Sequence, residues 1–152
     1  ALDALLAEKL PVTVFGEGWE KYSCGDEHSL RREPAVPFAL SFERIAKAHV
    51  LLNVSPIFNR GMHDRVPAGM ANHAVVLTDE NPYLRRTFTD GKELLFYSLE
   101  NPDTLCEQAE RALTDVRLRE KIAASAYETF EREYTWKRRA EQILAFAEEV
   151  EA

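Results

Sequence analysis

The chain has 152 residues, of which 45% are hydrophobic and 30% are charged, and this composition is typical of one compact soluble domain with a core. The formal charge of −7 opposes nonspecific attraction to a phosphate backbone, so a nucleic-acid partner is disfavoured. No apolar run approaches the roughly 20 residues of a membrane-spanning helix, and the acidic N-terminal segment is unlike a signal peptide, so we expect a cytoplasmic protein with no membrane span.

The first expected elements are a helix and a strand. Apolar residues recur at helical spacing over 2–9, and the β-branched run after Pro11 predicts a strand that enters a glycine turn over 16–19. The segment 19–37 has no clean period and is expected to be one long irregular loop.

Helices and short apolar strands then alternate. Helices are expected over 37–49, 63–72 and 82–88, and strands over 50–55, 74–78 and 94–98. The run "VLLNVS" is nearly all apolar, which is typical of a strand buried on both faces. This order predicts an α/β fold: a Rossmann-like parallel sheet with helices on both faces.

The last third, 102–151, is expected to be a helical tail of three helices. The third carries one apolar stripe: Trp136, Ala140, Ile143, Leu144, Ala147 and Val150. We treat 1–152 as a single Rossmann-like domain and as a fragment, because such a sheet normally opens with a strand; the first strand and an N-terminal domain are then absent. An edge left open in this way could pair with a second copy, so a homodimer is one expectation.

The informative polar residues cluster at two expected strand ends, where a doubly wound sheet has its ligand crevice. His63, Asp64 and Arg65 stand at the start of a helix, where an anion is favoured and an arginine fork suits phosphate. The alternative is that Asp64 is a helix cap and that the other two are solvated. At the next strand end, Asn81 is interpreted as a helix cap before Pro82.

Ligand contacts remain open at several further positions. Thr78, Asp79 and Glu80 could hydrogen-bond a hydroxylated ligand, whereas Gly69 indicates either nearness to a ligand or close packing of its helix on the sheet. No P-loop, nucleophile elbow or H-E-x-x-H motif is present, so no catalytic residue is assigned. Cys24 and Cys106 lack metal-ligand spacing, no metal site is predicted, and Cys106 is interpreted as a small core residue.

The stretch "HVLLNVSPIFNRGMHDRVPAGMANHAVVLTD", with the closing motif around Trp136 and Arg139, resembles the C-terminal domain of group 1 glycosyltransferases of GT-B fold. The closest resemblance is to the subgroup named for the spore maturation protein CgeB, whose H-x-R-V motif is matched at His63 and Arg65. The resemblance covers about 12–150.

This resemblance implies half of a two-domain hexosyltransferase-type enzyme that takes a sugar from a nucleoside diphosphate donor without a metal or other cofactor. It implies donor-phosphate contacts at Ser55, Gly61, His63 and Arg65. The acceptor site and the base would belong to the N-terminal domain, so the isolated domain would be inactive.

The sequence departs from this family in one respect. Many members carry two glutamates with seven residues between them, one for the donor sugar and one for the ribose, and Gly61 and Gly69 stand at those positions. Either Asp64, Asp79 or Glu80 substitutes for them, or the domain has lost its donor site and is a noncatalytic interaction module. A dinucleotide oxidoreductase is less favoured, because no glycine fingerprint precedes an acidic ribose ligand.

Overall fold

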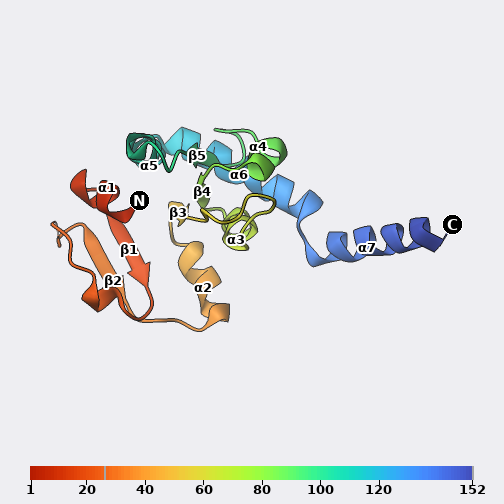
Figure 1. The fold of residues 1–152 in the computed structure, drawn as a ribbon, viewed down its shortest axis with the longest axis horizontal. Helices are drawn as coiled ribbons and strands as arrows, with labels where there is room; N and C mark the ends of the chain where they lie inside the picture. Colours follow the sequence, from red (N-terminus) through yellow and green to blue (C-terminus); the bar gives the residue numbers. More distant parts are fainter. Residues whose placement is uncertain (26, 152) are drawn as a thin grey trace.

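The computed structural model describes residues 1–25 and 27–151; Asp26 and Ala152, which the expected domain 1–152 includes, lie outside this part. In chain order the elements are α1 (Leu2–Ala7), β1 (Val12–Phe15), a 3₁₀ turn η1 (Trp19–Lys21), β2 (Leu30–Glu33), α2 (Phe38–Ile45), β3 (Val50–Asn53), α3 (Arg65–Ala71), β4 (Val75–Asp79), α4 (Pro82–Thr87), β5 (Leu95–Tyr97), α5 (Pro102–Thr114), α6 (Val116–Glu133) and α7 (Trp136–Glu151). Figure 1 shows their arrangement.

All described strand pairs are parallel, and they form two sheets rather than one. β1 pairs with β2, and β3, β4 and β5 pair in that order. The carboxyl ends of β3, β4 and β5 therefore lie at one edge of the larger sheet (Figure 1). The expected fold class is confirmed: an α/β fold with parallel strands and C-terminal helices.

The larger sheet is covered on both faces. Successive side chains of β4 point to opposite sides of the sheet, and each side belongs to a different core cluster. Val75 and Leu77 join one core cluster with Leu5 of α1 and the buried residues of α5. Val76 joins a second cluster with buried residues of α3 and α4, and α6 contributes Ile122 to the first cluster and Ala126 to the second. All five residues of β4 are buried, so this strand is the centre of the fold.

β2 corrects the expectation of one irregular loop over 19–37. Its sequence Leu-Arg-Arg-Glu holds a single apolar residue, Leu30, so neither alternation nor β-branching marks it as a strand. Arg32 stabilises the region, since its guanidinium donates to the carbonyls of Trp19 and Tyr22 and pairs with Glu27. Tertiary contacts, not a local pattern, fix this strand.

β3 is less buried than its apolar sequence predicts. Val50, Leu51 and Leu52 are only half-buried, and Asn53 is the fully buried residue. The reason is that β3 pairs with β4 on one side and has no described partner strand on the other. The preceding α2 ends at Ile45 and contains no buried residue; Phe38 is 72% exposed.

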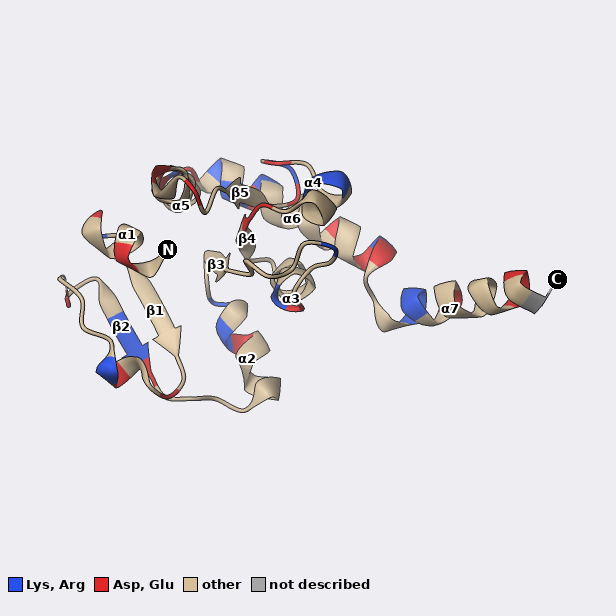
Figure 2. Ribbon diagram, in the orientation of Figure 1, with Lys and Arg blue, Asp and Glu red and all other residues tan. Residues whose placement is uncertain are grey.

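The helical tail forms as expected, but its three helices differ in burial. α5 and α6 pack on the core through Leu105, Ala109 and Ile122, and the half-buried Cys106 joins them as expected. α7 extends away from the body (Figure 1), and its apolar stripe is exposed, Trp136 by 88% and Leu144 by 64%. Figure 2 shows basic residues near the start of α7 and acidic residues near its end. No helix among the described residues could cross a membrane.

Candidate functional site

The carboxyl ends of β3 and β4 bring four of the expected site residues together around Asn53. The side chain of Asn53 donates from Nδ2 to Thr78 Oγ1 at 2.9 Å. Its Oδ1 accepts from Ser55 Oγ at 3.2 Å and from Arg65 Nε at 3.0 Å. The backbone N–H of Ser55 donates to Asp79 Oδ1 at 2.7 Å. The strand ends, the following loop and the start of α3 are thus joined in one polar network.

Two members of this network were missed from the sequence. Asn53 is fully buried, and its backbone carbonyl accepts a hydrogen bond from the hydroxyl of Tyr97, at the end of β5, at 3.1 Å. Both residues end apolar strands, and a polar atom that ends a buried strand needs a partner. A polar residue at the end of an apolar strand is therefore the sequence signal that could have identified Asn53 and Tyr97.

Asp79 is a buried carboxyl group, with 2% of its surface exposed. Burial raises its pKa above the ordinary value, because a charged carboxylate is poorly solvated there; the hydrogen bond from Ser55 and the charge of Arg65 act in the opposite direction. Burial also raises the pKa of Tyr97, and the charge of Asp79 adds to that effect.

Arg65 is the first residue of α3. The residue is exposed to solvent, although its Nε is hydrogen-bonded within the network. A second, longer hydrogen bond runs from Nη2 to the carbonyl of Val54 at 3.4 Å. The guanidinium is therefore tethered at one side and reaches solvent. An oriented, exposed guanidinium suits a phosphate or a carboxylate.

The side chains of His63 and Asp64 contact each other, and no described hydrogen bond joins them to the side chain of Asn53. His63 Nδ1 lies 2.5 Å from Asp64 Oδ1 and 3.2 Å from the backbone nitrogen of Arg65. A protonated ring favours the first contact and a neutral ring with a bare Nδ1 favours the second. The His63 ring also meets Phe58 edge to face, with centroids 5.8 Å apart. Asp64 precedes α3 but makes no side-chain cap bond.

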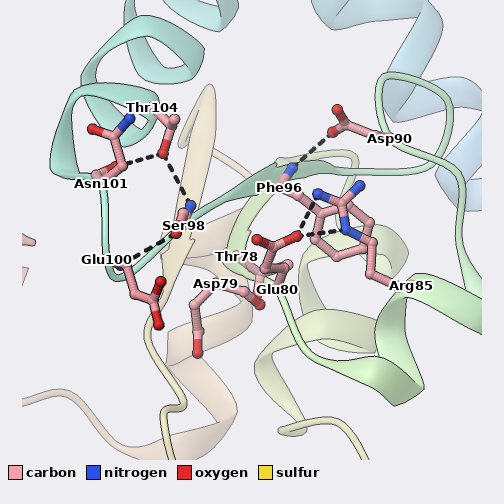
Figure 3. Close-up of polar contacts among 10 residues, drawn as sticks. All are labelled: Thr78, Asp79, Glu80, Arg85, Asp90, Phe96, Ser98, Glu100, Asn101 and Thr104. Atoms are coloured by element: carbon pink, nitrogen blue, oxygen red, sulfur yellow. Dashed lines mark hydrogen bonds and ion pairs between the residues drawn. The ribbon is translucent and has the colours of Figure 1, made fainter.

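Glu80 and Thr78 are engaged by neighbouring groups. The Glu80 carboxylate pairs with Arg85, at 2.5 Å from Nη2, and the Arg85 guanidinium lies over the Phe96 ring at 4.3 Å from its centroid (Figure 3). The ion pair is exposed on both sides, so it is weakly held. Thr78 is fully buried, and its hydroxyl donates to the carbonyl of Asp79 at 3.2 Å.

The two glycines that replace the expected glutamates have different surroundings. A Cβ built on Gly69 would lie 2.5 Å from Val76 Cγ2 and 3.0 Å from Leu51 Cδ2, so the close packing of α3 on the sheet accounts for this glycine. A Cβ on Gly61 would meet nothing within 4 Å.

Asn81 anchors the loop that contains Gly61, in addition to capping α4. Its Oδ1 accepts from the backbone of Leu84 at 2.8 Å, which confirms the cap. Its Nδ2 donates to the carbonyls of Phe58 at 2.6 Å and Gly61 at 3.3 Å. Asn81, which follows β4, thereby fixes the loop between β3 and α3.

A groove of about 330 Å³ has Asp64 and Arg65, which follow this loop, among its lining residues. Apolar side chains of α2, α3 and the α6–α7 junction line most of it, among them Phe42, Phe130 and Trp136. No group of three or more metal-ligating side chains occurs among the residues that the structure describes.

Solved structures with the same fold include glycosyltransferases. HepE of Anabaena in complex with UDP-glucose matches 97% of this chain and 44% of its own, with a TM-score of 0.78 and 13% identity. TarM matches 95% of this chain and 30% of its own, with a TM-score of 0.73 and 13% identity. The C-terminal domain of the group 1 glycosyl transferase LpcC of Francisella tularensis matches 88% of this chain and 92% of its own, with a TM-score of 0.55 and 12% identity.

At such low identities the likeness shows the fold alone, and the chain spans less than half the length of HepE. The fold corresponds to half of a GT-B glycosyltransferase. No curated protein matches the sequence. The model of one protein family, described as glycosyl transferase-like, matches residues 1–145. Since that match covers nearly the whole sequence, the chain belongs to the glycosyl transferase-like family.

Proposed function

We propose that this chain is the donor-binding domain of a glycosyltransferase that transfers a sugar from a nucleoside diphosphate to an acceptor. The observation that carries the proposal is the tethered guanidinium of Arg65, held by Asn53 at the carboxyl end of β3. An arginine fixed at this edge of a parallel sheet is suited to a diphosphate leaving group. Membership of the glycosyl transferase-like family supports this assignment.

The other proposed contacts lie on the loop between β3 and α3. His63 and Gly61 are half-buried beside Arg65, and Ser55 fixes the start of the loop through Asp79. For the hydroxyl groups of ribose or sugar we propose Asp64 and Glu80, whose carboxylates are exposed. Of the other candidates for these hydroxyl groups, Thr78 and Asp79 are buried, and we propose that they act on the ligand only through the Asn53 network. Gly69 packs on the sheet and is not proposed as a contact. The H-x-R-V match supports placement in the CgeB-like subgroup.

Titration calorimetry of the complete protein with UDP, GDP and dTDP, and with their sugars, tests the function. We expect one of these nucleotides to bind and Arg65→Ala to weaken binding roughly tenfold or more, since a charge-assisted hydrogen bond contributes about 1.5–3 kcal/mol. Arg117→Ala is the matched control, because Arg117 is exposed at the start of α6, and the next residues of this helix lie near the amino ends of β3 and β4. The affinity of this variant should equal that of wild type. Absence of heat with every nucleotide counts against donor binding.

A second candidate is a noncatalytic interaction module that keeps the fold without the donor site. The observation that favours it is Gly69, where contact with Val76 and Leu51 leaves no room for a glutamate side chain. A stable copurifying protein, together with unchanged cellular glycans in an Arg65→Ala strain, would favour this candidate over catalysis.

We also propose that a further parallel strand, from chain that precedes α1, lies between β1 and β3. α1 leads directly into β1, and a right-handed crossover places the strand before α1 next to β1 in the same sheet. β2 already occupies one edge of β1, so the new strand belongs on the other. Val12, Val50 and Leu52 pack against the same core cluster, which supports one continuous sheet.

A further inference from the structure

Asn53 has a fixed orientation in which each polar atom of its side chain has a partner. The hydroxyl of Thr78 donates its single proton to the carbonyl of Asp79, so it must accept from Asn53 Nδ2. Nδ2 therefore faces β4, and Oδ1 faces Ser55 and Arg65. Full burial, with 0% exposure, prevents water from replacing these partners.

This orientation gives Arg65 a neutral acceptor. Nε is bound at 3.0 Å by an amide oxygen, and Nη2 is bound more loosely by the Val54 carbonyl. Neither acceptor carries a charge, and no ion pair of Arg65 occurs among the described residues. A carboxylate in place of the amide would hold the guanidinium equally well but would cancel its attraction for an anion.

We propose that Asn53 is a positioning residue of the donor site: it orients the Arg65 guanidinium through a neutral amide oxygen, so that no hydrogen-bonded carboxylate neutralises the charge that Arg65 presents to the diphosphate of a nucleotide ligand. This inference rests on the proposed donor-binding function. Asn53 itself touches no ligand, since it is buried behind Arg65 and Ser55.

The test compares charged and uncharged ligands in the complete protein. Asn53→Asp keeps the shape and the acceptor but adds a negative charge beside Arg65. We expect affinity for UDP, GDP or dTDP, whichever wild type binds, to fall about tenfold or more and to depend less on salt, because the charge facing the diphosphate is reduced. Affinity for the corresponding nucleoside should stay within about twofold, and nucleotide affinity should recover as lower pH protonates the introduced carboxyl.

Two further variants separate positioning from loss of stability. Val76→Ala removes a buried methyl pair from β4 without touching the network, and at equal loss of stability it should leave nucleotide affinity and its salt dependence unchanged. Asn53→Leu, which removes the acceptor without adding charge, should weaken nucleotide binding with no recovery at lower pH.

The outcomes distinguish this inference from the function on which it rests. Failure of wild type to bind any nucleoside diphosphate overturns both. Normal binding by wild type with an unchanged affinity and salt dependence in Asn53→Asp overturns the positioning role alone. An equal loss of nucleoside and nucleotide affinity, independent of pH, would assign Asn53 a purely structural role and so also overturn it.

Discussion

At the scale of single residues, the polar network at the strand ends contains a charge that the fold disfavours. Asp79 is buried, and the hydrogen bond from Ser55 together with the charge of Arg65 offsets only part of its desolvation, so its pKa is raised. A carboxyl whose pKa is higher in the folded than in the unfolded state stabilises the fold below its unfolded pKa. That contribution is lost as pH rises through the folded pKa.

Asp79→Asn should therefore change the pH dependence of stability. The amide keeps an acceptor for the Ser55 N–H and is uncharged at every pH, so its melting temperature relative to wild type should be highest at neutral pH and should fall toward acidic pH. Melting curves across this range check the prediction. Glu128→Gln is the control, since it makes the same type of change, carboxyl to amide, at an exposed position on α6. A pH-independent difference for Asp79→Asn would contradict the argument.

At the scale of elements, the sequence predicted the helices and caps that depend on residues close together in the chain. Apolar periodicity located α5 and α6, and Asn81 caps α4 as expected. β2 was missed because its pairing depends on β1, not on its own residues. The site divides in the same way: Arg65 was expected from its residue type at the start of a helix, whereas Asn53 was not, because only the register of β3 on β4 brings its amide to Thr78.

The contact between α3 and the sheet predicts a cost for the smallest possible change at Gly69. Gly69→Ala adds a Cβ 2.5 Å from Val76 Cγ2, and the resulting overpacking, about 1–3 kcal/mol, outweighs the gain of about 1 kcal/mol in helix propensity. Chemical denaturation should show a net loss of stability. In a Val76→Ala background, Gly69→Ala should cost less stability, because the clashing methyl of Val76 is absent. If the losses from the two substitutions simply add, the steric explanation is wrong.

At the scale of the whole molecule, the described residues leave one edge open on each of β1, β2, β3 and β5, and one helix face uncovered. β1 and β3 each have a described partner on one side only, and both pack on the same core cluster. The apolar stripe of α7 is exposed along its length, and its amphipathic pattern predicted the helix but not what covers it.

The proposed strand between β1 and β3 makes a prediction for backbone amides. The amides of Val12 and Gly16 donate to carbonyls next to and in β2, so the alternate amides of Thr13 and Phe15 point to the other edge of β1. In β3 the same alternation applies: the carbonyl of His49 accepts from Val75 and therefore faces β4. The amide of Leu52, three residues later, points away from β4.

In the complete protein these outward amides should be bonded to the inserted strand. Hydrogen exchange followed by NMR should show them exchanging roughly a hundredfold or more slowly than the amide of Arg32, which points to the open side of the edge strand β2. The matched internal control is Leu77, which pairs with both neighbouring strands and whose amide should be protected regardless. If Thr13 and Leu52 exchange as fast as Arg32, both edges are open in solution and no strand lies between the two sheets.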